Sequence, residues 1–212
     1  MGERLIPRLL AGGHMVRALA RPGSEGKLPS GCGVNLGNAL DHTTYVDQVA
    51  PADTFVQLVG VAHPSPAKGA QFRSIDLVAG REAVVAAAKA RIQHFVYVSV
   101  AHPAPVMQAY IAVRSECEAM IRDSGLNATI LRPWYVLGPG HRWPCALIPV
   151  CWLMERLPAT REGAQRLGLV TLEQMLRALA GSVEDPCQGV RILGVPEIRR
   201  CTFDTPSATA TL

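Results

Sequence analysis

The segment that decides the fold is HFVYVSV, residues 94–100. It consists mainly of β-branched and aromatic residues with few charges, which predicts a strand buried on both faces and ending at Ser99. A loop broken by prolines follows over residues 101–105, and residues 107–122 then predict a helix. This order of strand, loop and helix indicates an α/β fold and draws attention to the side chains at the end of the strand.

Three side chains near this junction have chemical potential. Tyr110 and Arg114 are four residues apart, so they share one face of the predicted helix. Ser99, at the carboxyl end of the strand, is expected to face them. A serine hydroxyl can hold a carbonyl oxygen, a phenol can pass a proton, and a fixed cation favours the phenolate. We therefore interpret Ser99, Tyr110 and Arg114 as a candidate catalytic set.

The rest of the chain alternates predicted strands and helices, which indicates a parallel, doubly wound sheet with ligands at the carboxyl ends of its strands. Thr171 is expected to cap a helix that has Glu173 in its first turn. We expect one domain over residues 1–199 and a flexible tail over 200–212. The predicted strands are 14–20, 33–36, 54–61, 94–99, 128–131, 168–170 and 190–195, and the predicted helices are 2–11, 72–89, 107–122, 143–157 and 171–180.

Composition narrows the function classes. The chain has 212 residues, 49% of them apolar and 18% charged, as expected of a globular α/β protein. Its net charge of +4 comes from scattered Lys and Arg residues, so we expect a small-molecule partner and no nucleic acid. The six cysteines show neither a C-x-x-C motif nor a metal-ligand spacing, which favours reduced thiols in the cytoplasm and no metal. The most apolar run, residues 144–154, is shorter than the ~20 residues that a membrane span needs.

Three motifs together resemble the short-chain dehydrogenase/reductase superfamily, in its atypical NmrA-like and complex-I-subunit-like branch. They are VYVSV (96–100), YIAVR (110–114) and NATILRPWYVLGPG (127–140). The resemblance extends over about residues 1–199. Two departures stand out. The family's Tyr-x-x-x-Lys is Tyr110-x-x-x-Arg114 here, and the family's first strand and Gly-rich turn are absent, because the sequence begins at what looks like the last glycine of that turn, Gly2.

The resemblance implies an NAD(P) cofactor. Arg21 resembles the residue that contacts the ribose 2′-phosphate of NADP in this family. We therefore expect NADP as the cofactor, with NAD as the alternative. Asn38 and Ala39 resemble the dipeptide that contacts adenine, with Asn in place of the usual Asp. The full set of implied cofactor-binding residues is Gly2, Arg21, Asn38, Ala39, Val59, Gly60, Val61 and Pro133.

The resemblance also implies roles around the substrate. Ser99 would orient a substrate carbonyl, Tyr110 would act as general acid/base, and Arg114 would hold the cofactor ribose and lower the pKa of Tyr110. Arginine keeps the charge of the family's lysine but cannot relay a proton as lysine can. A capping region over about residues 134–165 would cover the substrate. The residues expected to line the substrate, with an ordinary core or loop role as the alternative, are His102, Trp134, Tyr135, His141 and Trp143.

Three functions are consistent with these residues. The first is an NADP(H)-dependent oxidoreductase or isomerase/epimerase that acts on a small carbonyl or apolar ring substrate, with a homodimer considered. The second is a non-catalytic NAD(P)-binding sensor or assembly protein. The third is a truncated chain that binds cofactor weakly or not at all.

The third possibility follows from the absent central strand. Without it, the predicted strands 14–20 and 54–61 each face a gap, and each buried backbone group left unpaired there costs roughly 1–3 kcal/mol. Three explanations are open: a longer natural protein, closure of these two strands on each other, or marginal stability. We favour a natural protein that starts upstream of Met1.

Overall fold

The computed structural model describes residues 1–138 and 161–201. Its central sheet has four parallel strands in the order β3–β4–β5–β8, and the parallel pairs β1–β2 and β6–β7 form two further sheets. The strands are β1 (Arg17–Ala20), β2 (Gly33–Leu36), β3 (Thr54–Gln57), β4 (His94–Val98), β5 (Ala128–Leu131), β6 (Tyr135–Leu137), β7 (Leu169–Thr171) and β8 (Val190–Leu193).

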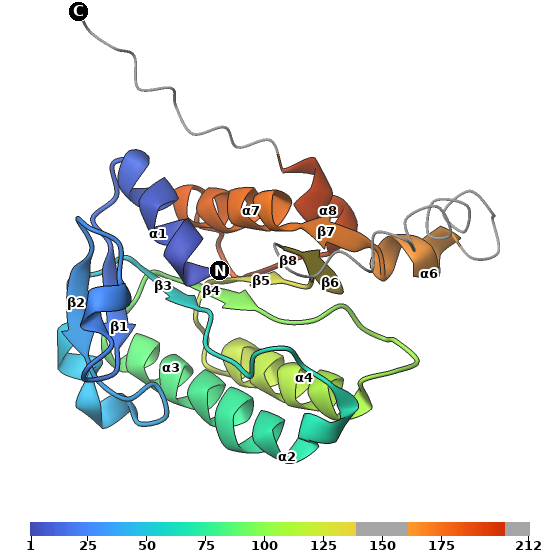
Figure 1. The fold of residues 1–212 in the computed structure, drawn as a ribbon, viewed down its shortest axis with the longest axis horizontal. Helices are drawn as coiled ribbons and strands as arrows, with labels where there is room; N and C mark the ends of the chain where they lie inside the picture. The colour runs from blue at the N-terminus through green and yellow to red at the C-terminus, as the bar shows by residue number, and fades with distance from the viewer. Residues whose placement is uncertain (139–160, 202–212) are drawn as a thin grey trace, which may run out of the picture.

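Helices cover both faces of the central sheet. Figure 1 shows α1, α7 and α8 on one face and α3 and α4 on the other. The predicted doubly wound, Rossmann-like α/β fold is therefore confirmed. The helices are α1 (Gly2–Ala11), α2 (Gly69–Gln71), the π-helical segment η5 (Phe72–Leu77), α3 (Val78–Lys89), α4 (Gln108–Asp123), α6 (Arg161–Arg166), α7 (Leu172–Glu184) and α8 (Val195–Arg200), with short 3₁₀ turns at Glu25–Lys27, His42–Thr44, Val46–Gln48 and Pro66–Lys68.

Strand β4 is the centre of the core, as its sequence predicts. Phe95 and Tyr97 pack into the apolar cluster on the α3–α4 side, whereas Val96 packs into the cluster on the α1–α7 side. All three are almost completely buried, so the alternation of side chains along the strand fills both layers. On the α3–α4 side, a Cβ atom on Gly80 would lie 2.6 Å from the Sγ atom of Cys117, so glycine allows the two helices to approach closely.

The carboxyl-terminal helices confirm one prediction and correct another. The Oγ1 atom of Thr171 accepts a hydrogen bond from the Gln174 amide, so Thr171 caps α7 as predicted. The predicted strand 190–195 instead ends at Leu193, because α8 begins at Val195 and has a proline in its first turn. Strand β6 is an addition to the predicted strands, none of which includes residues 135–137. The predicted helix 143–157 lies outside the described residues, and the division into a domain and a capping region stays a prediction.

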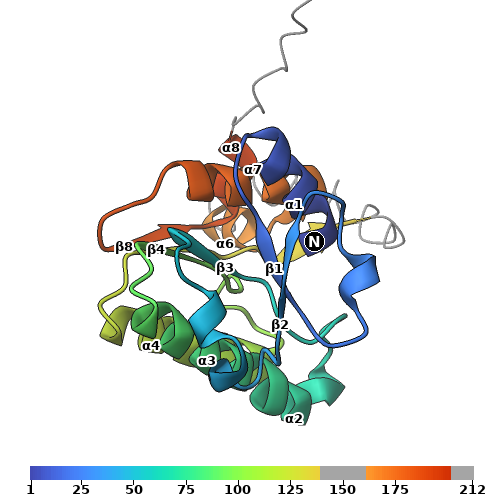
Figure 2. The ribbon, with the colours of Figure 1, turned by 90° about the vertical axis from the view of Figure 1, so that its left-hand side faces the viewer.

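Strands β1 and β3 are shorter than predicted, and each has one edge without a strand neighbour in the described part of the chain. Strand β1 pairs with β2, and β3 pairs with β4. In Figure 2 the β1–β2 pair faces the viewer, and β3 lies beside it. The two strands therefore do not close on each other by strand pairing. Strand β3 ends at Gln57, whose side chain accepts a hydrogen bond from Val59 N (3.1 Å) and donates one to the Ala79 carbonyl (2.8 Å).

Length and polarity argue against a membrane span in the part of the chain that the structure describes. No helix there is both long enough and apolar enough to cross a bilayer.

Candidate active site

One face of α4 carries three polar side chains at intervals of four residues. Tyr110, Arg114 and Glu118 lie one above the other on this face, which packs against the carboxyl ends of β4 and β5. Arg114 and Glu118 are buried, with 6% and 1% of their surface exposed. Buried charges require partners, and those partners divide the face into two clusters, one around Arg114 and one around Glu118.

Arg114 is held in a fixed position next to Tyr110. Its guanidinium donates to the Tyr97 hydroxyl (3.1 Å) and the Val98 carbonyl (3.0 Å), and it forms an ion pair with Asp76. The centre of the guanidinium lies 5.1 Å from the centroid of the Tyr110 ring, within the range of a cation–π contact. The structure therefore brings together the predicted phenol and the predicted fixed cation.

The π-helical segment η5 supplies two residues of this cluster that the sequence analysis missed. One carboxylate oxygen of Asp76 pairs with Arg114, and the other accepts the amide of Val61 (3.0 Å), in the loop after β3. The Phe72 ring packs against Tyr110, with 4.9 Å between their centroids. Segments of π-helix are frequent at functional sites. A signal for Asp76 exists in the sequence, since it is a lone carboxylate in the apolar run IDLVAG.

Arg114 lowers the pKa of the Tyr110 phenol as expected, but burial has the opposite and larger effect. Burial raises the pKa of the Tyr110 phenol, and the nearby carboxylate of Asp76 raises it further. Arg114 lowers this pKa but does not outweigh burial, so the net direction is upward. The phenol is consequently protonated at neutral pH, which suits a proton donor better than a proton acceptor.

Ser99 belongs to the Glu118 cluster and not to the Tyr110 pair. It is buried just after β4, and its hydroxyl donates to Glu118 Oε1 at 2.6 Å. A serine has one O–H donor, so this hydrogen bond uses the donor that was expected to hold a substrate carbonyl. Of the predicted three-residue set, the structure brings Tyr110 and Arg114 together and directs the Ser99 hydroxyl to Glu118.

Glu118 also binds two arginines. Arg132 donates to both of its carboxylate oxygens, through Nε at 2.9 Å and through Nη2, and Arg122 donates at 3.0 Å. Burial raises the pKa of Glu118, but the hydrogen bonds from Arg132, Ser99 and Arg122 outweigh it, so the pKa is lowered. The sequence shows Glu118 four residues after Arg114, a spacing that could have identified it.

The predicted cofactor-binding residues follow the carboxyl ends of strands. Arg21 comes directly after β1 and is exposed, Asn38 and Ala39 follow β2, and Pro133 follows β5. The exposed residue Val59 and its neighbours follow β3. Ligands of open α/β sheets bind at this edge, so these positions suit a dinucleotide.

The first turn of α1 fits the same interpretation. A Cβ atom on Gly2 would lie 3.9 Å from the Leu58 side chain, which places the start of α1 beside the end of β3. Arg4 and Leu5 donate their amides to the Met1 carbonyl, and no acceptor is described for the amides of Gly2 and Glu3. Free amides at a helix start can bind a phosphate group.

The residues expected to line the substrate are partly described. Trp134 and Tyr110 both pack against the apolar cluster of Val100, Ala104 and Ile111, and the role of Trp134 in lining the substrate stays a prediction. Tyr135 begins β6 and is half-buried. His102 is half-buried, with Nε2 3.6 Å from the carboxylate of Glu118. His141 and Trp143 lie outside the described residues.

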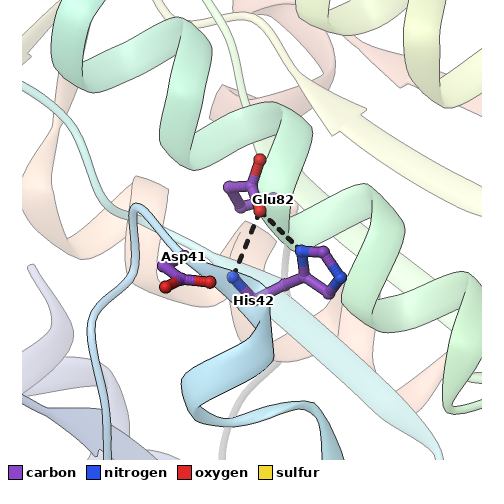
Figure 3. Close-up of side chains that lie close together, drawn as sticks. All are labelled: Asp41, His42 and Glu82. Carbon is purple, nitrogen blue, oxygen red and sulfur yellow. Dashed lines mark hydrogen bonds and ion pairs between the residues drawn. The ribbon is translucent and has the colours of Figure 1, made fainter.

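A second polar cluster connects the loop after β2 to α3. Asp41, His42 and Glu82 place potential metal-ligand atoms within 4.8 Å of one another (Figure 3). Each already has a protein partner: His42 Nδ1 lies 2.6 Å from Glu82, His42 Nε2 lies 2.9 Å from Lys89 Nζ, and Asp41 accepts from Thr43. These bonds satisfy both ring nitrogens of His42, so we interpret the cluster as a brace between the loop and the helix.

The parallel sheet, the free amides of α1 and the phenol–guanidinium pair together define a dinucleotide-binding α/β protein. A family model described as NAD(P)H-binding matches residues 1–140 of the 212, so the chain belongs to this family. An NAD(P)-type cofactor is thereby supported.

Solved structures share the fold. WbmH of Bordetella bronchiseptica in complex with NAD⁺ aligns with a TM-score of 0.65 at 20% identity, covering 91% of this chain and 71% of that one. MoeE5 in complex with UDP-glucuronic acid and NAD aligns with a TM-score of 0.65 at 19% identity, covering 92% of this chain and 72% of that one. A short-chain dehydrogenase/reductase superfamily protein of Agrobacterium tumefaciens with bound NAD aligns with a TM-score of 0.64 at 15% identity, covering 91% of this chain and 74% of that one. These structures have the fold that the resemblance implies, and the family model supports the NAD(P)-binding part of that resemblance. No curated protein matches the sequence.

Proposed function

We propose that this protein is an NADP(H)-dependent oxidoreductase, or an isomerase/epimerase of the same chemistry, that acts on a small carbonyl substrate. The observation that carries the proposal is the guanidinium of Arg114, held 5.1 Å from the Tyr110 ring beside the end of β4. A bound nicotinamide would supply or accept the hydride. Tyr110 would supply the proton, and Gly2, Arg21, Asn38, Ala39, Val59, Gly60, Val61 and Pro133 would hold the cofactor.

The two side chains divide the work of proton transfer. Because burial keeps the Tyr110 phenol protonated, it can donate to a carbonyl oxygen that is becoming an alkoxide. The positive charge of Arg114 would stabilise the phenolate that remains. Asp76 keeps the guanidinium in place, and water would return the proton, since arginine does not deprotonate in proteins.

The preference for NADP rests on Arg21, which is exposed directly after β1. Titration of tryptophan fluorescence with NADPH and with NADH tests it. NADPH should bind more tightly, and Arg21→Gln should abolish the difference, whereas Arg81→Gln, an exposed arginine on α3, should preserve it. Equal affinities of the unmutated chain for the two cofactors would refute the preference.

Turnover tests the proposed function itself. The oxidation of NADPH is followed with a panel of small aldehydes, ketones, quinones and nucleotide sugars, the last because MoeE5 was solved with one. Tyr110→Phe should lower the rate by about 100-fold or more, while the affinity for NADPH changes less than about twofold. Tyr45→Phe, a buried tyrosine before β3, is the matched control. Equal rates in Tyr110→Phe and Tyr45→Phe would contradict the role of Tyr110.

One observation favours a second candidate, a non-catalytic NAD(P)-binding sensor or assembly protein. The Ser99 hydroxyl donates to Glu118 and leaves a substrate carbonyl without that donor. This candidate predicts tight NADPH binding with no oxidation across the whole panel. The first candidate predicts oxidation with at least one member.

A further inference from the structure

A cavity of about 330 Å³ opens at the carboxyl ends of the central strands. Ala101 lies beyond β4, Arg132 directly follows β5, and Gly194 directly follows β8. The remaining wall comes from Arg166 at the end of α6 and from α8. Its position is the one where open parallel sheets bind ligands. None of the residues assigned above to the cofactor lines it, and all of them except Pro133, which follows β5, come after β1, β2 or β3 or begin α1.

Two arginines that line this cavity have N–H groups for which no acceptor is described. No hydrogen bond or ion pair is described for the guanidinium of Arg166 within residues 1–138 and 161–201, and its Nε atom is buried without an acceptor. Arg132 directs Nε and Nη2 to Glu118, while its Nη1 atom has no described partner. A buried N–H of a cation without an acceptor is costly, and a ligand oxygen would satisfy it.

Among the charged residues described around the cavity, Arg166 carries a positive charge that no described carboxylate neutralises. Glu197 also lines the cavity, but its two carboxylate oxygens accept from Gly194 N (3.0 Å) and Arg200 (3.3 Å). Glu118, behind Arg132, is matched by Arg132 and Arg122. Burial and the neighbouring Arg132 lower the pKa of His102, so this histidine adds a hydrogen-bonding group and no fixed charge at neutral pH.

The cavity is next to the surroundings of Tyr110. Leu167, the residue after Arg166, packs against the same apolar cluster as Tyr110 and Trp134. A small molecule whose charged end contacts Arg166 would therefore have its other end in the neighbourhood of the phenol.

We propose that this cavity binds the anionic group of a small molecule, a carboxylate or a phosphate, with Arg166 as the main contact and Nη1 of Arg132 as the second. The interpretation of that molecule as the substrate rests on the proposed function, whereas the binding of the anion does not. Cation and oxyanion would form charge-assisted hydrogen bonds, which are the stronger kind in proteins.

Calorimetric titration of the cofactor-free chain at low chloride tests the site, with inorganic phosphate, acetate and neutral acetamide as probes. Phosphate or acetate should bind saturably, and acetamide should not. Arg166→Gln should weaken the binding about tenfold or more, and Arg166→Lys should lose less because it keeps the charge. Arg81→Gln, on the opposite face of the sheet, removes the same charge and should change nothing (Figure 1). Thermal melting confirms that each variant is folded.

The outcomes separate the sources of the anion. Binding of phosphate alone indicates a phosphorylated ligand, and binding of acetate alone indicates a carboxylic acid; both support the site. Unsaturable heats with both anions, or equal affinities in Arg166→Gln and the unmutated chain, would overturn it. Because no cofactor or turnover is involved, failure here is distinct from failure of the proposed reaction.

Discussion

Asp76 and Glu118 are both carboxylates with 1% of their surface exposed, and each pairs with an arginine at the candidate site, yet their pKa values shift in opposite directions. Burial raises the pKa of Asp76 above its ordinary value, and Arg114 recovers only part of that shift. The pKa of Glu118 is lowered although burial opposes this. Because the two carboxylates are equally exposed, the hydrogen-bond partners of each one must determine the direction of its pKa shift.

The number of hydrogen-bond donors explains the difference. Asp76 accepts two, from Arg114 and from the amide of Val61. Glu118 accepts four, two from Arg132 and one each from Ser99 and Arg122. Hydrogen bonds to the charged form of a carboxylate stabilise it. The four hydrogen bonds to Glu118 therefore outweigh the rise in pKa that burial causes, whereas the two to Asp76 do not. We infer that the Glu118 cluster fixes the ends of β4 and β5, and that the Arg114 cluster serves the chemistry of Tyr110.

The largest expected effect is that of Glu118→Gln. It leaves the half-buried guanidinium of Arg132 without its buried carboxylate partner, and removing one partner of a buried ion pair typically costs about 3–5 kcal/mol in the free energy of unfolding. Urea unfolding measures it, with Glu116→Gln, an exposed position on the same helix, as control. A loss no greater than that of the control would refute the structural role of Glu118.

The pH dependence of this loss has a defined sign. A carboxyl group with a lowered folded-state pKa contributes stability above its unfolded pKa, about 4.3 for glutamate, and that contribution disappears as the pH falls through the folded-state value. The difference in stability between the unmutated chain and Glu118→Gln should therefore be full at neutral pH and shrink below about pH 4. A difference that grows on acidification would contradict the lowered pKa.

Asp76→Asn should cost less than Glu118→Gln, about 2 kcal/mol. A raised pKa means that folding disfavours the ionised form of Asp76, and asparagine can still accept a hydrogen bond. The same urea series with Asp47→Asn, an exposed aspartate, as control measures the cost. If Asp76→Asn destabilises the chain more than Glu118→Gln does, the argument from donor number is wrong.

Gly60→Ala tests the packing of the Arg114 cluster. An added Cβ atom would lie 2.5 Å from Arg114 Nη2 and 2.8 Å from Asp76 Oδ1, so one of them must move. Overpacking of this kind costs about 1–3 kcal/mol, and we expect about 1 kcal/mol because a side chain can yield. Gly163→Ala, where a Cβ atom would meet open space, is the control. Equal melting temperatures for the two variants would show that Arg114 is not tightly held.

The sequence predicted the elements better than it predicted the partners of the charged residues. Strand β4 follows from its run of apolar, β-branched and aromatic residues, and strand β2 and helix α1 also have glycines at an end; all of these are local signals. Asp76, 38 residues from Arg114 in the sequence, meets it only because η5 packs on α4, and no local pattern contains that contact. The hydroxyl of Ser99 was interpreted from its position at a strand end, whereas its direction depends on Glu118 across the layer.

The most direct test of this division between the two clusters is the turnover of Ser99→Ala, measured beside Tyr110→Phe with the same substrate and saturating NADPH. Ser99 contacts Glu118, so Ser99→Ala should lower the melting temperature slightly and keep the turnover rate within about threefold of the unmutated chain. Tyr110→Phe should keep the melting temperature and lose the rate. A loss of turnover in Ser99→Ala as large as that in Tyr110→Phe would show that Ser99 acts on the substrate and would contradict the structural role assigned to Ser99 and Glu118.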